Sequence, residues 1–267
     1  MKNLKALSRE ELKSLAPSVF NHTVKEGLTD KYVHIPTDSI VDDMEKLGWL
    51  PYQVKTVKAR KGSNASLKKH LIQFFNPNVV INDENGNKDM FPNILLINSH
   101  DGSTSVRFEM GVFRLVCENG LVIKSQDFGG FKMKHMGYTF EELRVHINTL
   151  VEELPNVVEK LNKFTQIQMT EEEQYNFAMK AVEARFGEEK QLPQNEIENL
   201  LLAERKEDQG NGAWEVFNRV QEKLTQGGFG YLNVRGKVRK ARPIKNFTQD
   251  LEFNQKIWAL LEESVLS

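Results

Sequence analysis

The sequence predicts an α+β protein with an antiparallel sheet in its first half, flanking helices, and a helical second half. Between Trp49 and Lys124, short apolar runs are separated by turn dipeptides, which is typical of strands. From Thr139 onwards, apolar residues instead recur every three or four positions, which is typical of helices. At 267 residues, the chain is long enough for one large domain or two small ones.

Two helices are expected before the sheet. Ser8 and Glu11 have the spacing of a capping box, which marks the start of the first helix. Pro17 disfavours helix in the residue before it, so this helix should end near Ala16. A second helix is predicted over 38–47, because its apolar residues form one stripe and a glycine follows it.

The middle of the first half predicts strands joined by tight turns. Asn85-Gly86 and Asp101-Gly102 are turn dipeptides between apolar runs, which is a strong hairpin signal. Short linkers of this kind favour antiparallel pairing. The strand candidates are 52–57, 70–75, 79–81, 94–98, 112–117 and 121–124.

The second half predicts a series of helices. Capping boxes are expected at Thr139 with Glu142 and at Thr170 with Glu173. Pro155 should kink or split the first of these helices. Further helices are predicted over 194–206, over 214–224 before Gly227-Gly228, and from Thr248, as N-cap, to the end of the chain.

Four segments follow from these patterns, and we expect them to form one continuous domain. In the last segment, Arg235 to Arg239 alternates as a strand would, which predicts cations on one face. The segments are an N-terminal helical segment at 1–48, a sheet region at 49–137, an acidic helical region at 138–208, and C-terminal helices with a basic segment at 209–267.

Composition excludes several classes of protein. No apolar run approaches 18 residues, so no membrane-spanning helix and no membrane partner are expected. The polar N-terminus has no apolar core, which argues against a secretory signal. Because Cys117 is the one cysteine, an internal disulfide is impossible, and the cytoplasm is the expected compartment.

The net charge of −1 hides an uneven distribution of charge. From Lys46 to Asn82 there are seven Lys/Arg and no acid, and from Tyr231 to Phe247 there are six Lys/Arg and no acid. Between them, Glu141 to Glu215 holds 17 acids against eight bases. Segregation of this kind suggests an electrostatic role rather than a neutral metabolic pocket.

The two basic segments are the clearest functional signal. Cations in flexible loops can neutralise phosphates, and neighbouring aromatic rings can stack on bases without sequence preference. The alternative is that the segments do not bind nucleic acid and form two solvated basic faces, one of which pairs with the acidic helices. The candidate nucleic-acid-binding residues are Lys55, Lys58, Arg60, Lys61, Lys68, Lys69 and Tyr52 in the first segment, and Arg235, Lys237, Arg239, Lys240, Arg242, Lys245 and Tyr231 in the second.

The acidic region between the basic segments has two interpretations. We favour a solvated helical face. The alternative is that this face docks against basic segments of a neighbouring copy, which would give a homo-oligomer.

The stretch from Ser99 to Ser103 is the most polar cluster of the sheet region. His100 and Asp101 could bind a metal or polarise a water, but two candidate ligands are too few for a metal site. We favour an Asp-Gly hairpin turn with polar flanks, and we expect no metal and no cofactor. Cys117 could act as a nucleophile beside His100 and Asn119, but it ends an apolar run and is more typical of a core residue.

Motifs in a fixed order give the chain a family resemblance. They include Asn98 to Ser103, Phe113 to Leu121, Ala213 to Glu222 and Arg242 to Lys245, followed by Asn254 and Trp258. Together they resemble the phage- and plasmid-borne family labelled domain of unknown function 932. The resemblance implies a mobile-element protein of a bacterial cytoplasm, and it implies no mechanism. The resemblance groups six motif residues and leaves open whether their role is structural or functional. They are Ser99, His100, Asp101, Arg114, Cys117 and Asn119.

Taken together, the sequence favours a non-enzymatic nucleic-acid-binding protein acting in replication or recombination. Single-stranded DNA is the expected partner, and strand annealing needs only charge neutralisation and free base edges. One alternative is a host-takeover or anti-defence effector that acts by binding a host protein. A second alternative is a metal-dependent nuclease that uses His100, Asp101 and Glu109.

Overall fold

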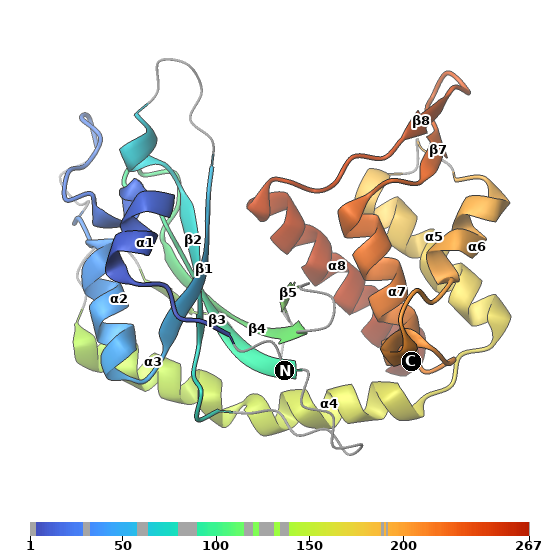
Figure 1. Ribbon diagram of the computed structural model, residues 1–267, viewed down its shortest axis with the longest axis horizontal. Coiled ribbons are helices and arrows are strands. Elements are labelled where there is room, and N and C mark those ends of the chain that lie inside the picture. The colour runs from blue at the N-terminus through green and yellow to red at the C-terminus, as the bar shows by residue number, and fades with distance from the viewer. Residues whose placement is uncertain are drawn as a thin grey trace. The chain divides into compact units, whose positions relative to one another are not determined.

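The computed structural model describes residues 4–28, 33–57, 64–79, 90–114, 120–122, 131–133, 139–187, 190 and 192–266. It divides into two compact units, Met1–Pro155 and Asn156–Ser267, which are taken in turn (Figure 1). Among the described residues, no helix combines the length and apolarity needed to cross a bilayer. The predicted α+β class is confirmed, with the sheet in the first half and helices dominating the second.

The first unit is built on an antiparallel sheet. Its strands pair in the order β1 (Leu50–Thr56), β2 (His70–Phe75), β3 (Met90–Asn98), β4 (Val106–Arg114) and β5 (Gly120–Val122), and β6 (Phe131–Met133) also pairs with β4. The Asp101-Gly102 turn joins β3 to β4 as predicted, with Gly102 at φ +73°. β4 begins six residues before the predicted strand at 112–117. The Asn85-Gly86 turn lies outside the described residues.

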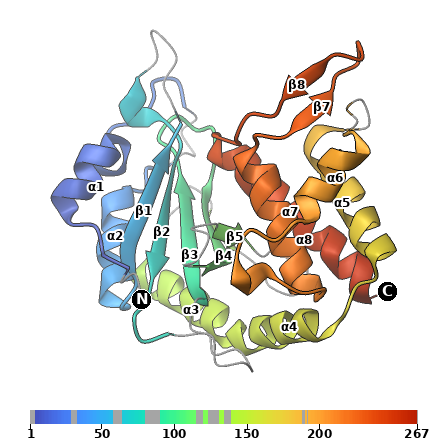
Figure 2. The ribbon, with the colours of Figure 1, turned by 45° about the vertical axis from the view of Figure 1, so that its right-hand side comes forward.

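Helices pack beside this sheet (Figures 1 and 2). They are α1 (Arg9–Leu15), the 3-10 turn η1 (Pro17–Phe20), α2 (Thr37–Lys46) and α3 (Phe140–Glu152), with a second 3-10 turn, η2 (Ala65–Leu67), before β2. The capping box of Ser8 and Glu11 is confirmed, and the side chain of Thr139 caps α3. Apolar residues from α2, such as Ile40 and Met44, are fully buried, as are Ile72 and Ile94 of the sheet. Burial of such side chains is the main force that holds helices on a sheet.

The second unit is helical. Pro155 splits the long helix as predicted, because α4 (Leu154–Gln166) begins two residues after α3 ends. It is followed by α5 (Glu171–Phe186), α6 (Gln194–Leu201), the 3-10 turn η3 (Lys206–Asp208), α7 (Ala213–Gln226) and α8 (Phe247–Leu266). The capping box of Thr170 and Glu173 is confirmed. The helix predicted over 194–206 is too long, since α6 ends at Leu201.

An aromatic core joins α4, α7 and α8. The indole of Trp258 lies 5.2 Å from the ring of Phe164 and 5.9 Å from that of Phe217, both nearly edge-on. Beside it, the buried amides of Gln221 and Asn254 form a hydrogen bond of 2.7 Å, which satisfies two polar groups inside the core. These contacts place α8 firmly against α7.

A two-stranded hairpin, β7 (Gly230–Leu232) with β8 (Val238–Lys240), connects α7 to α8 in the chain and projects away from the helices (Figure 2). The prediction of a strand over 235–239 is confirmed at Val238 and Arg239, which lie in β8, and is wrong for 235–237. Residues 233–237 form a turn instead, because the side chain of Asn233 accepts hydrogen bonds from the amides of Arg235 and Lys237, each 3.0 Å long. The N-cap prediction for the last helix is also wrong, since Asn246 rather than Thr248 accepts from the first free amides of α8.

The hairpin is anchored where the chain crosses itself. Gly227 ends α7 at φ +73°, and a β-carbon there would lie 2.8 Å from the backbone oxygen of Ala241. Gly228 donates a 2.9 Å hydrogen bond to that same oxygen, and Ala241 donates to Phe229. A side chain at Gly227 would therefore push the two backbone segments apart.

We expect Gly227→Ala to destabilise the second unit more than Gly228→Ala does. Gly228 also has a positive φ, +100°, but nothing lies within 4 Å of a β-carbon placed there. Gly228→Ala should cost only the conformational penalty, about 1–2 kcal/mol, whereas Gly227→Ala adds a clash worth about 1–3 kcal/mol. Urea denaturation of the two variants measures the difference, and equal losses of stability would contradict the close approach.

Candidate functional site

A buried polar cluster lies at the end of the sheet that carries the Asp101-Gly102 turn. His70 begins β2, Asn98 ends β3, and His100 follows it, while Thr37 begins α2. All four are fully buried, and the half-buried His34 lies beside them. The ring of His100 is centred 4.8 Å from that of His34 and 5.5 Å from that of His70.

Backbone carbonyls determine which nitrogen of each buried imidazole carries the proton. Nε2 of His100 lies 3.0 Å from the carbonyl oxygen of Ser18, so Nε2 must donate, and Nδ1 is left to accept from His34 at 3.0 Å. Nδ1 of His70 faces the carbonyl of Lys68 at 3.1 Å, which leaves its Nε2 to accept.

The hydroxyl of Thr37 links the network together. It donates to Nε2 of His70 at 2.9 Å and accepts from the amide of Asn98, also at 2.9 Å. Neutral imidazoles thus satisfy the network fully, and burial together with the nearby His100 lowers the pKa of His70 to about 3. Such a network resists protonation and braces the end of the sheet.

The turn from Ser99 to Ser103 is braced in the same way. Oγ of Ser99 accepts from the amide of Thr104 at 3.1 Å, and a carboxylate oxygen of Asp101 accepts from the amide of Ser103 at 3.1 Å. The ammonium nitrogen of Lys68 lies 3.4 Å from Oδ2 of Asp101. Burial raises the pKa of Asp101, but hydrogen bonds from Ser103 and Lys68 outweigh it and hold that pKa below its ordinary value.

This geometry does not assemble a metal site in the part of the chain that the structure describes. No group of three or more His, Cys, Asp or Glu side chains there is placed to hold a metal ion. His100 already uses both ring nitrogens in hydrogen bonds, and Glu109 is buried within β4. Of the other motif residues, Arg114 is described only as the last residue of β4, and Cys117 and Asn119 lie outside the described residues.

Thr37→Val should destabilise the first unit by about 1–3 kcal/mol. Valine keeps the shape, but it leaves the amide of Asn98 and a nitrogen of His70 buried without their partner. Thr37→Ser restores a hydroxyl and is the matched control, with an expected loss well below that of the valine variant. Urea denaturation compares them, and equal losses would mean that the hydroxyl does not hold the network together.

The unfolding free energy should fall as the pH drops below about 6.5, and His70 should account for part of the slope. The unfolded imidazole takes up a proton near its ordinary pKa of 6.5, whereas the folded one does so only near 3. The stabilisation from His70 is therefore fully present above pH 6.5 and is lost at about 1.4 kcal/mol per pH unit towards pH 3. Denaturation from pH 7 to pH 4 should show a shallower slope in His70→Gln, and identical slopes would refute the assignment.

The described part of the first basic segment is partly engaged in the fold. Lys55, Lys68 and Lys69 are half-buried. The hydroxyl of Tyr52 donates to Gln73 at 2.5 Å, and its ring meets Phe75 and Phe91 edge-on. Burial raises the pKa of Tyr52. The remaining predicted residues, Lys58, Arg60 and Lys61, lie outside the described residues.

The second basic segment is exposed, and we call residues 230–245 the basic arm. Within the described residues, none of its six cations forms an ion pair with a carboxylate. Tyr231 lies opposite Arg239 in the hairpin, so the ring and the cation share one side of the ribbon. The six exposed cations are Arg235, Lys237, Arg239, Lys240, Arg242 and Lys245.

Residues from the acidic region support the base of the arm, and sequence reasoning missed them. The ring of Tyr231 stacks on Phe186 at 5.3 Å, with the ammonium of Lys190 lying 5.4 Å from the Tyr231 ring centre. Arg185 lies 4.7 Å from the ring centre of Phe186 and donates a 2.5 Å hydrogen bond to the carbonyl oxygen of Arg242. No local pattern could have linked Arg185 or Lys190 to the arm, because Arg242 and Tyr231 lie 57 and 41 residues further along the chain.

The fold and these two clusters define an α+β protein with a braced histidine network in its sheet unit and an exposed basic arm in its helical unit. Residues 26–258 match the model of the family described as Domain of unknown function (DUF932), and the chain belongs to that family. The family resemblance drawn from the motifs is thereby confirmed.

Two relatives come from Escherichia coli (strain K12): UPF0380 protein YafZ and UPF0380 protein YfjQ. Each is 29% identical to this chain over 256 residues, which is 96% of this chain and 90% of the relative. No solved structure matches the chain significantly.

Proposed function

We propose that this protein binds nucleic acid through the basic arm, with single-stranded DNA as the favoured partner. The observation that carries the proposal is the set of six exposed cations between Arg235 and Lys245, none of them paired with a described carboxylate. Cations that stabilise a fold are usually matched by nearby acids. Here none of the six forms an ion pair within the described residues, so their charge is available to a polyanion.

The shape of the arm supports contact with a flexible strand. Arg235 and Lys237 lie in the turn, and Arg239 and Lys240 lie on β8, so the cations are spread along a ribbon instead of lying on one flat face. A strand that follows this ribbon would place successive phosphates near successive cations. Each neutralised phosphate releases condensed counterions, which favours binding at low salt.

Strand annealing and self-association fit the same surface. Neutralising phosphates on two strands removes their repulsion, and the base edges stay free to pair. The three glutamates that open α5, Glu171 to Glu173, are exposed and negatively charged. They offer a docking surface for the basic arm of a second copy, which would give an oligomer.

We propose that a phage or another mobile element encodes the protein. We also propose that it acts in replication or recombination in the bacterial cytoplasm. This context rests on the family resemblance in the motifs, and the basic arm suits the handling of exposed DNA strands. No step of this function requires a cofactor or a metal.

Replacing four arm cations by alanine should weaken DNA binding and flatten its salt dependence. We expect the Lys237→Ala, Arg239→Ala, Lys240→Ala, Arg242→Ala variant to lose up to about 3 units of the slope of log K against log salt, at about 0.7 per phosphate contact. Fluorescence anisotropy with a labelled 30-nucleotide single strand, from about 50 to 200 mM salt, measures both quantities.

The control changes charge equally at places far from the arm in sequence. Lys13, Lys25, Lys180 and Lys206 are all exposed, and their joint replacement by alanine should leave the slope close to that of the unaltered protein. If the unaltered protein binds no strand at about 50 mM salt, the proposal is wrong. The protein-binding alternative would then be favoured, with the arm docking on an acidic host protein.

A further inference from the structure

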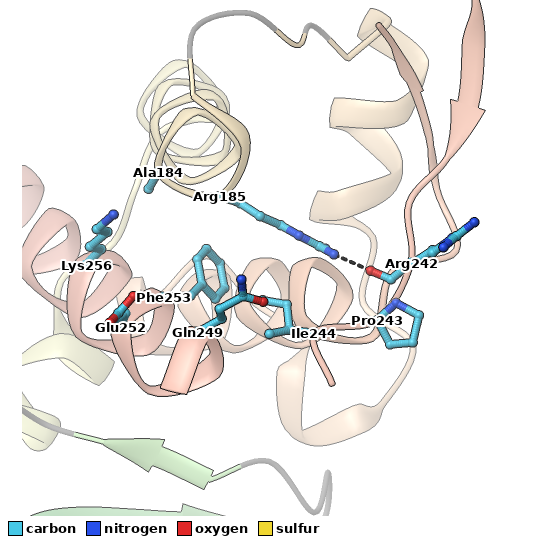
Figure 3. Close-up of a pocket in the computed structure, with 9 residues that line it drawn as sticks. All are labelled: Ala184, Arg185, Arg242, Pro243, Ile244, Gln249, Glu252, Phe253 and Lys256. Carbon is cyan, nitrogen blue, oxygen red and sulfur yellow. Dashed lines mark hydrogen bonds between the residues drawn. The ribbon is translucent and has the colours of Figure 1, made fainter. Parts of the chain in front are cut away.

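A cavity of about 320 Å³ opens beside the basic arm within the second unit (Figure 3). The end of α5 contributes Arg185, the arm contributes residues 242–244, and the first half of α8 contributes Gln249, Phe253 and Lys256. Figure 3 shows Arg185 reaching from α5 towards the carbonyl of Arg242, while the guanidinium of Arg242 points away from the cavity. The cavity therefore has one fixed cation, Arg185, in its wall.

The guanidinium of Arg185 is held in place but not satisfied. One terminal nitrogen donates to the carbonyl oxygen of Arg242, and the other, Nη1, is buried with no hydrogen-bond partner among the described residues. Contacts with the rings of Phe186 and Phe229, at 4.7 and 5.4 Å, fix the plane of the group. Within the described residues it forms no ion pair. A buried charged donor without an acceptor is costly, and an anion that enters the cavity would relieve that cost.

Arg185 stays charged under ordinary conditions. Burial lowers its pKa to about 10, which still leaves the guanidinium protonated at neutral pH. Two other charged side chains line the cavity, the exposed Lys256 and the exposed Glu252, and neither is paired with a described residue. The cations outnumber the acid, and the amide of Gln249 adds a hydrogen-bond donor.

We propose that this cavity binds the terminal phosphate of a nucleic-acid strand, with Arg185 as its principal ligand and Lys256 as a second cation. A terminal phosphate carries more charge than a phosphate inside the strand and has three free oxygens, which suits a planar guanidinium with unused donors. Because residues 242–244 belong both to the cavity wall and to the basic arm, a strand bound on the arm can place its end in the cavity. The identification of the phosphate as a strand end rests on the proposed function.

Substitution of Glu252 tests whether the charge of the cavity wall controls anion binding. Glu252 repels an anion bound beside Arg185, so Glu252→Gln should strengthen phosphate binding by about twofold to fivefold. Lys256→Gln should weaken it by a similar factor, and Arg185→Gln by tenfold or more. Lys206→Gln removes an exposed cation of η3 that does not line this cavity, and it should have no effect.

Isothermal titration calorimetry with inorganic phosphate measures the site without DNA. We expect one saturable site in the unaltered protein and the stated order of affinities in the variants. Arg185→Gln removes a half-buried group and can perturb the fold, but Glu252→Gln and Lys256→Gln change only exposed side chains. Absence of saturable binding, or opposite or equal effects of these two variants, would overturn the proposal.

Three strands of one sequence distinguish a strand end from a free phosphate. Anisotropy should show tighter binding of the 30-nucleotide strand when it carries a 5′- or a 3′-phosphate than when both ends are hydroxyls, and Arg185→Gln should remove the difference. Equal affinity for all three strands overturns the strand-end assignment and leaves the proposed function intact. Binding of inorganic phosphate with no binding of any strand rejects the proposed function and the strand end together, and it identifies a small-anion site.

Discussion

The close crossing of two backbone segments at Gly227 is the constraint on which the second unit depends. It brings the end of α7 to within contact of Ala241 and Arg242, so the hairpin leaves and rejoins the helices at nearly one point. The carbonyl of Arg242 is thereby placed where Arg185 can donate to it. Without the crossing, the arm would lose its anchor and the cavity would lose one wall.

The helices around this crossing are held by a different kind of interaction. Trp258, Phe217 and Phe164 fill the core with edge-on contacts, and the pair of Gln221 and Asn254 fixes the register of α7 against α8. Apolar contacts alone tolerate small rotations of a helix, whereas a buried amide pair has one satisfied geometry. The position of α8 thus determines where Gln249, Phe253 and Lys256 line the cavity.

Local signals in the sequence predicted most of the fold, because capping boxes, prolines and terminal glycines act within a few residues. These signals failed where the hydrogen bonds of one side chain stabilise a different local structure from the one that the pattern favours. The alternation from Arg235 to Arg239 suits a strand, yet Asn233 accepts the amides of Arg235 and Lys237 and closes a turn. Likewise, Asn246 lies two residues before Thr248, and its side chain accepts from the amide of Thr248 as the N-cap of α8.

The candidate sites were predictable only in part. The exposed cations of the arm were visible as an acid-free run, since charge density is a property of sequence. The sequence indicated only one member of the histidine network. His100 belongs to a polar motif, but its partners His34 and His70 come from other elements of the fold. Arg185 gave no signal at all, because its importance comes from a carbonyl 57 residues away.

The two clusters illustrate opposite ways of burying polar groups. In the sheet unit, every assigned proton of His70, His100 and Thr37 has an acceptor, so that cluster gains nothing from a ligand. At Arg185, one charged donor has no acceptor within the part of the chain that the structure describes. A fold selected only for stability would remove such a group, since it weakens the structure by itself. Arg185 also packs on Phe186 and Phe229 and anchors the carbonyl of Arg242, so its unused donor, rather than its position, is what the proposed anion accounts for.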